Sequence, residues 1–135
     1  MIIWIASYPK SGNTWVRSFL TAYYFCENGI FDIDKLNLIE DYPNKQFFKE
    51  KVKQGEIHKH WETSQKDIRD QKKVKFLKTH NSLITAFGND FTKPEYSLGV
   101  IYVIRDPRNV ITSVKNHNDL DTYDEALKFM QDENK

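Results

Sequence analysis

The stretch IIWIASYPKSGNTWVRSFLTAYY, residues Ile2 to Tyr24, decides the fold that the sequence predicts. It begins with a continuous apolar run, which is typical of a strand buried on both faces of a parallel sheet. Turn-forming residues follow from Ser7 to Gly12, where glycine permits a backbone conformation that a side chain would resist. Apolar residues then recur at helical spacing: Trp15, Val16, Phe19, Leu20, Tyr23 and Tyr24. We therefore expect a strand, a tight loop and an amphipathic helix that Asn13 or Thr14 caps.

A loop that joins a strand to a helix start directs several backbone N–H groups towards one point. The helix dipole and these amides favour a bound anion, and the ammonium group of Lys10 adds a full positive charge. In a Walker A nucleotide loop the lysine follows the second glycine, whereas here Lys10 precedes Gly12. The sequence therefore predicts a phosphate or sulfate site of another type. The alternative is a strand–loop–helix unit with an incidental lysine.

The composition describes one globular domain that spans residues 1–135, with 39% hydrophobic and 29% charged residues. A net charge of +1 favours neither nucleic acid nor an anionic membrane as a partner. Cys26 is the only cysteine, which excludes an internal disulfide and fits a reducing compartment. No apolar run approaches membrane-spanning length, and the start of the chain lacks the pattern of a signal peptide. We expect a cytoplasmic protein.

Two further apolar runs predict strands that end in residues able to act at a site. Val74 to Lys78 is followed by Thr79 and His80, and Leu98 to Ile104 is followed by Arg105. Open α/β sheets bind their ligands at the carboxyl ends of their strands. We therefore expect these residues and the first loop to share one edge of the sheet. A histidine that merely closes a loop is the alternative.

A second helix start follows the last of these strands. Asp106 suits the cap and Pro107 the first position of a helix, with Ser113 two turns along it. Arg105 stands beside this helix start, where its fixed fork of donors makes a second anion site. The histidines His58 and His60 have no acidic or cysteine partner at metal-site spacing, so we expect no metal site.

Three of these segments together resemble a known family. YPKSGNTW, from Tyr8 to Trp15, resembles the loop of sulfotransferases that binds the 5′-phosphosulfate of 3′-phosphoadenosine 5′-phosphosulfate (PAPS), with Asn13 where threonine is common. Lys78-Thr79-His80 resembles the motif of the alcohol- and phenol-type enzymes that contains the general base. Arg105 and Ser113, eight residues apart, are similar to the pair that holds the 3′-phosphate. The three segments also follow the family's order.

The resemblance implies an α/β fold, with a parallel sheet, flanking helices and a P-loop-like nucleotide-binding core, and PAPS as co-substrate without a metal. It implies transfer of a sulfuryl group to a hydroxyl or amine acceptor. Lys10 would stabilise the leaving phosphate, His80 would act as general base, and Lys78 would lie close to the sulfuryl group. The residues implied to bind the co-substrate are Lys10, Ser11, Gly12, Asn13, Thr14, Trp15, Arg105 and Ser113.

The chain departs from the family in length. The resemblance covers the N-terminal half of the family's domain, and no residue after Ser113 resembles the later loop that closes over the co-substrate. We therefore expect a fragment or a reduced form, which a homo-oligomer or a separate chain could complete. Two other functions stay open: a non-catalytic module that binds 3′-phosphoadenosine nucleotides, and an atypical P-loop nucleotide kinase.

Overall fold

The computed structural model describes residues 1–48 and 52–132. Its strands are β1 (Ile2–Ser7), β2 (Glu40–Asp41), β3 (Lys75–Thr79), β4 (Thr85–Ala86), β5 (Asn89–Asp90) and β6 (Ser97–Val103). Its α-helices are α1 (Asn13–Phe25), α2 (Trp61–Asp70), α3 (Pro107–His117) and α4 (Tyr123–Gln131). Short 3-10 helices span Glu27–Gly29, Ile33–Leu38, Lys45–Phe47 and Gln54–His60. The three strands expected from the sequence are confirmed, with ends that differ by one or two residues.

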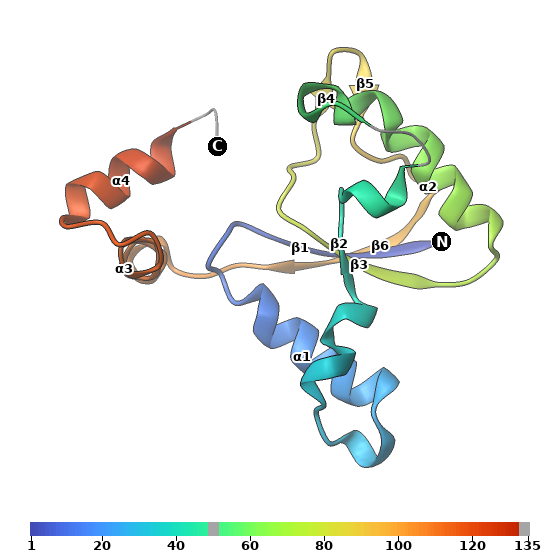
Figure 1. Ribbon diagram of the computed structural model, residues 1–135, viewed down its shortest axis with the longest axis horizontal. Coiled ribbons are helices and arrows are strands. Elements are labelled where there is room, and N and C mark those ends of the chain that lie inside the picture. Colours follow the sequence, from blue (N-terminus) through green and yellow to red (C-terminus); the bar gives the residue numbers. More distant parts are fainter. Residues whose placement is uncertain (49–51, 133–135) are drawn as a thin grey trace.

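A four-stranded sheet organises the molecule, in the order β2-β3-β1-β6 with every pairing parallel. Figure 1 shows α1 on one side of this sheet, α2 on the other, and α3 with α4 beyond the ends of β1 and β6. The predicted α/β fold with flanking helices is confirmed. Because the strands are parallel, β1, β3 and β6 all end at the same edge.

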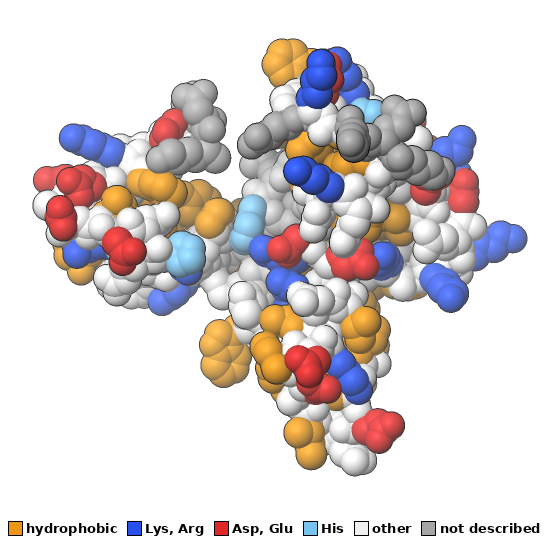
Figure 2. All heavy atoms as spheres, viewed as in Figure 1, with side chains coloured by type: hydrophobic (Ala, Val, Ile, Leu, Met, Phe, Trp, Pro, Cys, Tyr) orange, Lys and Arg blue, Asp and Glu red, His pale blue; other side chains and the backbone are white. Residues whose placement is uncertain are grey.

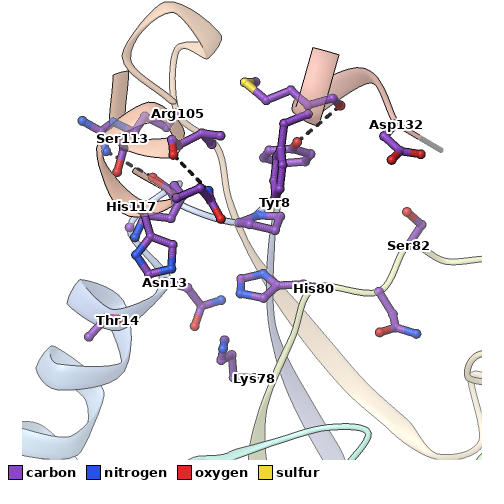
Figure 3. A pocket seen from close by; sticks show the side chains of 18 residues that line it. Tyr8, Asn13, Thr14, Lys78, His80, Ser82, Arg105, Ser113, His117 and Asp132 are labelled. Atoms are coloured by element: carbon purple, nitrogen blue, oxygen red, sulfur yellow. Dashed lines mark hydrogen bonds between the residues drawn. The ribbon is translucent and has the colours of Figure 1, made fainter. Parts of the chain in front are cut away.

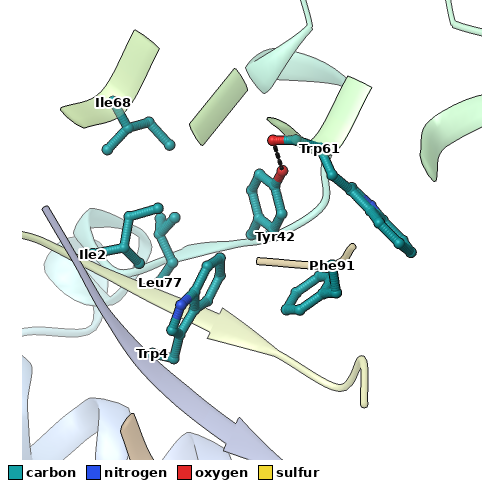
Figure 4. Packing of buried hydrophobic residues seen from close by; sticks show 7 residues of the cluster. All are labelled: Ile2, Trp4, Tyr42, Trp61, Ile68, Leu77 and Phe91. Carbon is teal, nitrogen blue, oxygen red and sulfur yellow. Dashed lines mark hydrogen bonds between the residues drawn. The ribbon is translucent and has the colours of Figure 1, made fainter. Parts of the chain in front are cut away.

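The main hydrophobic core lies between the sheet and α2 and consists largely of aromatic side chains (Figure 4). Trp4 of β1 packs edge-on against Tyr42, with ring centroids 5.3 Å apart, and Trp61 of α2 packs edge-on against Phe91 at 5.2 Å. Such edge-to-face contacts add to the burial of the rings. The buried amide of Gln65 also donates to the carbonyl oxygen of Phe91 at 2.6 Å. These contacts fix α2 to one face of the sheet.

The first helix packs against the sheet with its polar face, contrary to the pattern of its apolar residues. Its buried side chains are Asn13, Arg17 and Thr21, which recur every fourth residue. On the outside, Trp15 is 84% exposed, and Figure 2 shows apolar side chains on the surface of the part that α1 forms. Trp15, Phe19 and Tyr23 of the apolar stripe are therefore exposed, whereas Tyr24 packs against Phe76 of β3 with ring centroids 5.1 Å apart.

Strand β6 forms an edge of the sheet, and its apolar side chains are largely exposed. Leu98, Val100 and Tyr102 are 57%, 61% and 63% exposed. The sequence pattern of this strand is typical of burial on both faces, and the structure does not bury the strand in this way. Within residues 1–48 and 52–132, no other strand pairs with its outer edge. None of the helices in this part of the chain combines the length and hydrophobicity needed to cross a membrane.

The contrast between Leu77 and Leu98 gives a test of this arrangement. Leu77 of β3 is fully buried, so Leu77→Ala should lower the free energy of unfolding by roughly 2–5 kcal/mol, because it leaves a cavity. Leu98→Ala should lower it by less than about 1 kcal/mol, because the side chain is already hydrated. Urea unfolding at a concentration where the chain is monomeric measures both values. Equal losses would show that β6 is covered.

Candidate active site

The three segments singled out in the sequence meet in one pocket at the carboxyl ends of β1, β3 and β6 (Figure 3). Its volume is about 910 Å³, and α3 and α4 contribute its far wall. Lys10 comes from the loop after β1, His80 follows β3, and Arg105 follows β6. The predicted site residues that line this pocket are Lys10, Gly12, Asn13, Thr14, Lys78, His80, Arg105 and Ser113.

Two of the predicted residues do not line the pocket. Ser11 is buried, with 7% of its surface exposed, and its backbone N–H donates to the carbonyl oxygen of Tyr8 at 3.3 Å. Trp15 projects into solvent from the first turn of α1. Their roles in binding the co-substrate remain predictions.

The loop leaves the N-terminus of α1 open towards the pocket. Gly12 is the N-cap in a left-handed conformation, with φ at 103°, and no side-chain cap hydrogen bond is present among the described residues. Glycine adopts this conformation without strain. The expected cap by Asn13 or Thr14 is therefore wrong, because the helix begins at Asn13 itself. Uncapped N–H groups and the helix dipole leave this end suited to an anion.

The start of α3 differs, because a side chain already occupies it. Asp106 accepts a hydrogen bond from the backbone N–H of Arg108 at 2.9 Å, and Pro107 takes the first turn, as predicted. The same carboxylate pairs with the Arg108 guanidinium at 2.6 Å, and these contacts hold the pKa of Asp106 below its usual range. Of these two helix starts, α1 is therefore the one that offers free donors to a ligand.

Arg105 connects the last strand to the first loop. Its Nη1 donates to the backbone carbonyl oxygen of Lys10 at 3.1 Å. Lys10 has a positive φ of 65°, which is uncommon for a residue with a side chain, and the hydrogen bond helps to hold that conformation. The bond therefore places two cationic residues, 95 positions apart in the sequence, at the same edge of the pocket.

Asn13 ties the first turn of α1 to the end of β1. Its amide nitrogen donates to the carbonyl oxygen of Ile5 at 3.0 Å and to Oγ of Ser7 at 3.1 Å. Its buried Oδ1 atom has no hydrogen-bond partner within the described part of the chain. The two hydrogen bonds of the amide nitrogen hold the start of α1 against the end of β1.

His80 has the tautomer that a general base requires. Its Nδ1 lies 2.7 Å from the backbone carbonyl oxygen of Ser7. A carbonyl oxygen can only accept, so Nδ1 carries the hydrogen and Nε2 keeps its lone pair. Burial lowers the pKa of His80 below its usual 6.5, Lys78 lowers it further, and the hydrogen bond to Ser7 opposes the shift. The imidazole is therefore neutral and able to accept a proton at physiological pH.

The pocket includes residues that the sequence patterns did not single out. His117 follows Ser113 by one helical turn on α3, and Figure 3 shows its ring projecting into the pocket as that of His80 does. Its spacing of four residues from Ser113 was a readable signal, because such residues share a helix face. Tyr8 donates to the carbonyl oxygen of Met130 at 3.4 Å and so links the loop to α4. No sequence pattern indicates that contact.

The parallel sheet and the cationic pocket at its carboxyl edge define an α/β protein with a pocket suited to an anionic ligand. The chain belongs to the sulfotransferase family: the family model described as "Sulfotransferase domain" matches residues 2–133. Membership assigns the protein to the transferases that use a sulfate donor. A search among curated proteins finds no match, and neither does a search among solved structures. Within the described residues, no group of three or more potential metal ligands is present.

The lowered pKa of His80 predicts a stability change in mild acid. Between the usual 6.5 and the lower folded value, the unfolded chain binds more protons than the folded chain. The free energy of unfolding should therefore fall as the pH is lowered through this window. Urea unfolding at pH 7.5 and pH 5.5 should show a smaller loss for His80→Gln than for the wild type. Equal losses in the wild type and in His80→Gln would contradict the lowered pKa of His80.

Proposed function

We propose that the protein transfers a sulfuryl group from PAPS to a hydroxyl or amine acceptor. The observation that supports this function best is the shared pocket of Lys10, His80 and Arg105, which come from three separate segments. Each lies after a strand of the parallel sheet, where α/β proteins bind nucleotides. The family membership supports the same reaction class.

The pocket fits a ligand that carries a phosphate group at each end. Lys10, the hydroxyl of Thr14 and the open N-terminus of α1 suit the 5′-phosphosulfate. Arg105 and Ser113 suit the 3′-phosphate, since a guanidinium binds phosphate through two parallel donors. The uncapped N–H groups at the start of α1 are donors that such a ligand would satisfy.

The chemistry needs a base, an electrostatic partner for the leaving group and an aligned acceptor. PAPS supplies an activated sulfuryl group on a good leaving phosphate. Nε2 of His80 would take the proton of the acceptor as its oxygen or nitrogen forms a bond to sulfur. Lys10 would neutralise the charge that develops when the bond from sulfur to the bridging oxygen breaks. Lys78 would stabilise the equatorial sulfuryl oxygens, and the products are the sulfated acceptor and 3′-phosphoadenosine 5′-phosphate.

The alternatives are a non-catalytic module for 3′-phosphoadenosine nucleotides and an atypical P-loop kinase. The neutral, oriented His80 favours an enzyme over a module, because binding alone needs no base. A kinase would need a carboxylate for Mg²⁺ at a strand end. Asp106 has that position, but its oxygens already bind the backbone and side chain of Arg108.

We further propose that residues 1–135 form one domain whose exposed edge is covered by additional protein, either in a homo-oligomer or by a completing chain. The exposed apolar side chains of β6 and of the outer face of α1 support this. The Leu98→Ala comparison, repeated at concentrations where the chain associates, would report the cover as a larger loss of stability.

A cytoplasmic location is part of the proposal and fits the single Cys26, which is free.

Nucleotide preference separates the sulfotransferase and the module from the kinase. We expect 3′-phosphoadenosine 5′-phosphate to raise the midpoint of thermal unfolding, since it binds the folded chain only, and ATP with Mg²⁺ to raise it less. Arg105→Ala should remove most of the shift. Arg108→Ala is the matched control, because its guanidinium already binds Asp106. A shift with ATP and Mg²⁺ alone would reject the proposed donor.

Turnover separates the sulfotransferase from the module. Transfer of labelled sulfate from PAPS to a panel of alcohols, phenols and amines should occur with the wild type. His80→Ala should lower kcat by about 10²–10⁴-fold, the usual contribution of a general base, with nucleotide binding retained. His117→Ala provides a control for loss of a pocket imidazole. Unchanged turnover in His80→Ala would reject the base, and binding without any transfer by the wild type would favour the module.

A further inference from the structure

Asp41, the last residue of β2, joins two cations through a single carboxylate oxygen. Its Oδ1 lies 3.2 Å from Nζ of Lys78 and 3.5 Å from Nη1 of Arg17. Arg17 is buried, and its Nη2 donates to the carbonyl oxygen of Ile39 at 2.7 Å and to that of Leu36 at 3.3 Å. The guanidinium is therefore held by the backbone independently of Asp41. The same carboxylate oxygen therefore contacts the fixed guanidinium of Arg17 and the ammonium group of Lys78, which lines the pocket.

The pairing of β2 with β3 fixes this contact. Asp41 stands opposite Lys78 in the parallel register, and the backbone N–H of Tyr42 donates to the carbonyl oxygen of Lys78 at 2.8 Å. Glu40 precedes Asp41 and stands opposite the buried Leu77. Successive residues of a strand face opposite sides of the sheet, so the Glu40 carboxylate lies on the other face. There it pairs with Lys75 at 2.9 Å.

We propose that Asp41 is a positioning residue for sulfuryl transfer, whose carboxylate holds the ammonium group of Lys78 in place to meet the sulfuryl group. Lys78 lines the pocket, whereas Asp41 is not among the lining residues, so Asp41 acts through Lys78. This inference rests on the proposed function.

The need for such a residue follows from the flexibility and the charge of Lys78. A lysine ammonium is a compact charge on a stem of four rotatable bonds, so its position is not set by its backbone alone. Arg17 is a like charge that also contacts Asp41, and it would repel Lys78 if the carboxylate were absent. With Asp41 present, the carboxylate neutralises one of the two cations. The remaining positive charge is available to an anionic ligand in the pocket.

Asp41 also affects the base. The charged groups that act on His80 are Lys78, which precedes it on β3, Arg17 of α1 and Asp41 of β2. The two cations lower the pKa of His80, and Asp41 raises it. Loss of the Asp41 charge should therefore lower that pKa. Because the neutral imidazole is the active form, the acidic limb of the pH–rate profile should move to lower pH.

The test is Asp41→Asn in a sulfuryl-transfer assay with PAPS. We expect kcat to fall about 10-fold while KM for PAPS changes less than about threefold, because the loss lies in alignment. Glu40→Gln is the matched control, since it removes the same charge from the same strand on the opposite face, and it should leave kcat within about twofold. In a Lys78→Met background Asp41→Asn should cause no further fall. Two outcomes would overturn the proposal. The first is that Asp41→Asn lowers kcat as much in the Lys78→Met background as in the wild type. The second is that Asp41→Asn lowers kcat in the wild type no more than Glu40→Gln does.

A second measurement decides the proposal without turnover. The carbon relaxation of the lysine ε-methylene groups reports how well each ammonium group is held. Asp41→Asn should increase the mobility of Lys78 and leave that of Lys75 unchanged, and Glu40→Gln should do the reverse. If the wild type transfers no sulfate, the proposed function fails while this measurement still tests the tether. Unchanged mobility of Lys78 in Asp41→Asn would overturn it.

Discussion

The parallel register of β1 between β3 and β6 is the constraint on which the site depends. Ala6 stands opposite both Thr79 and Tyr102, so the three strands end within one or two residues of each other. This register brings the loop after β1 next to His80 and Arg105, which follow β3 and β6. Two contacts to backbone carbonyl oxygens lock the arrangement, from His80 to Ser7 and from Arg105 to Lys10. The pocket is therefore formed by residues at strand ends, and hydrogen bonds to main-chain carbonyl oxygens hold the side chains of His80 and Arg105 in place.

The polar inner face of α1 follows from the same constraint. A helix that presents its N-terminus to a ligand must be held at a fixed angle to the sheet, and hydrogen bonds specify that angle more narrowly than apolar contacts do. Asn13 binds the end of β1, and Arg17 binds the carbonyl oxygens of Leu36 and Ile39 and the carboxylate of Asp41. Burial of these groups leaves Trp15, Phe19 and Tyr23 of α1 exposed.

The sequence predicted which segments form strands and helices, and it predicted that the site residues lie together. It did not predict which face of each strand or helix is buried. The apolar runs located β1, β3 and β6, and residues after strand ends located Lys10, His80 and Arg105. The pattern failed for α1 and β6, because periodicity reports which residues are apolar and not what covers them. The roles of Asp41 and Arg17 could not be predicted either. The contacts of Asp41 with Arg17 and Lys78 join residues 24 and 37 positions apart through a two-residue strand that has no apolar pattern.

Electrostatics explains why these distant contacts matter. The chain has a net charge of +1, yet Lys10, Lys78 and Arg105 all line one pocket. Like charges in a shared pocket repel one another, and the repulsion is least screened where water is partly excluded. The carboxylate of Asp41 offsets Lys78, whereas Arg105 and Lys10 share a main-chain contact that neutralises neither charge. An anion with two phosphate groups would remove that remaining repulsion. On the proposed function, binding of a donor with two phosphate groups would relieve this repulsion, so we expect the site to favour multiply charged donors over singly charged anions.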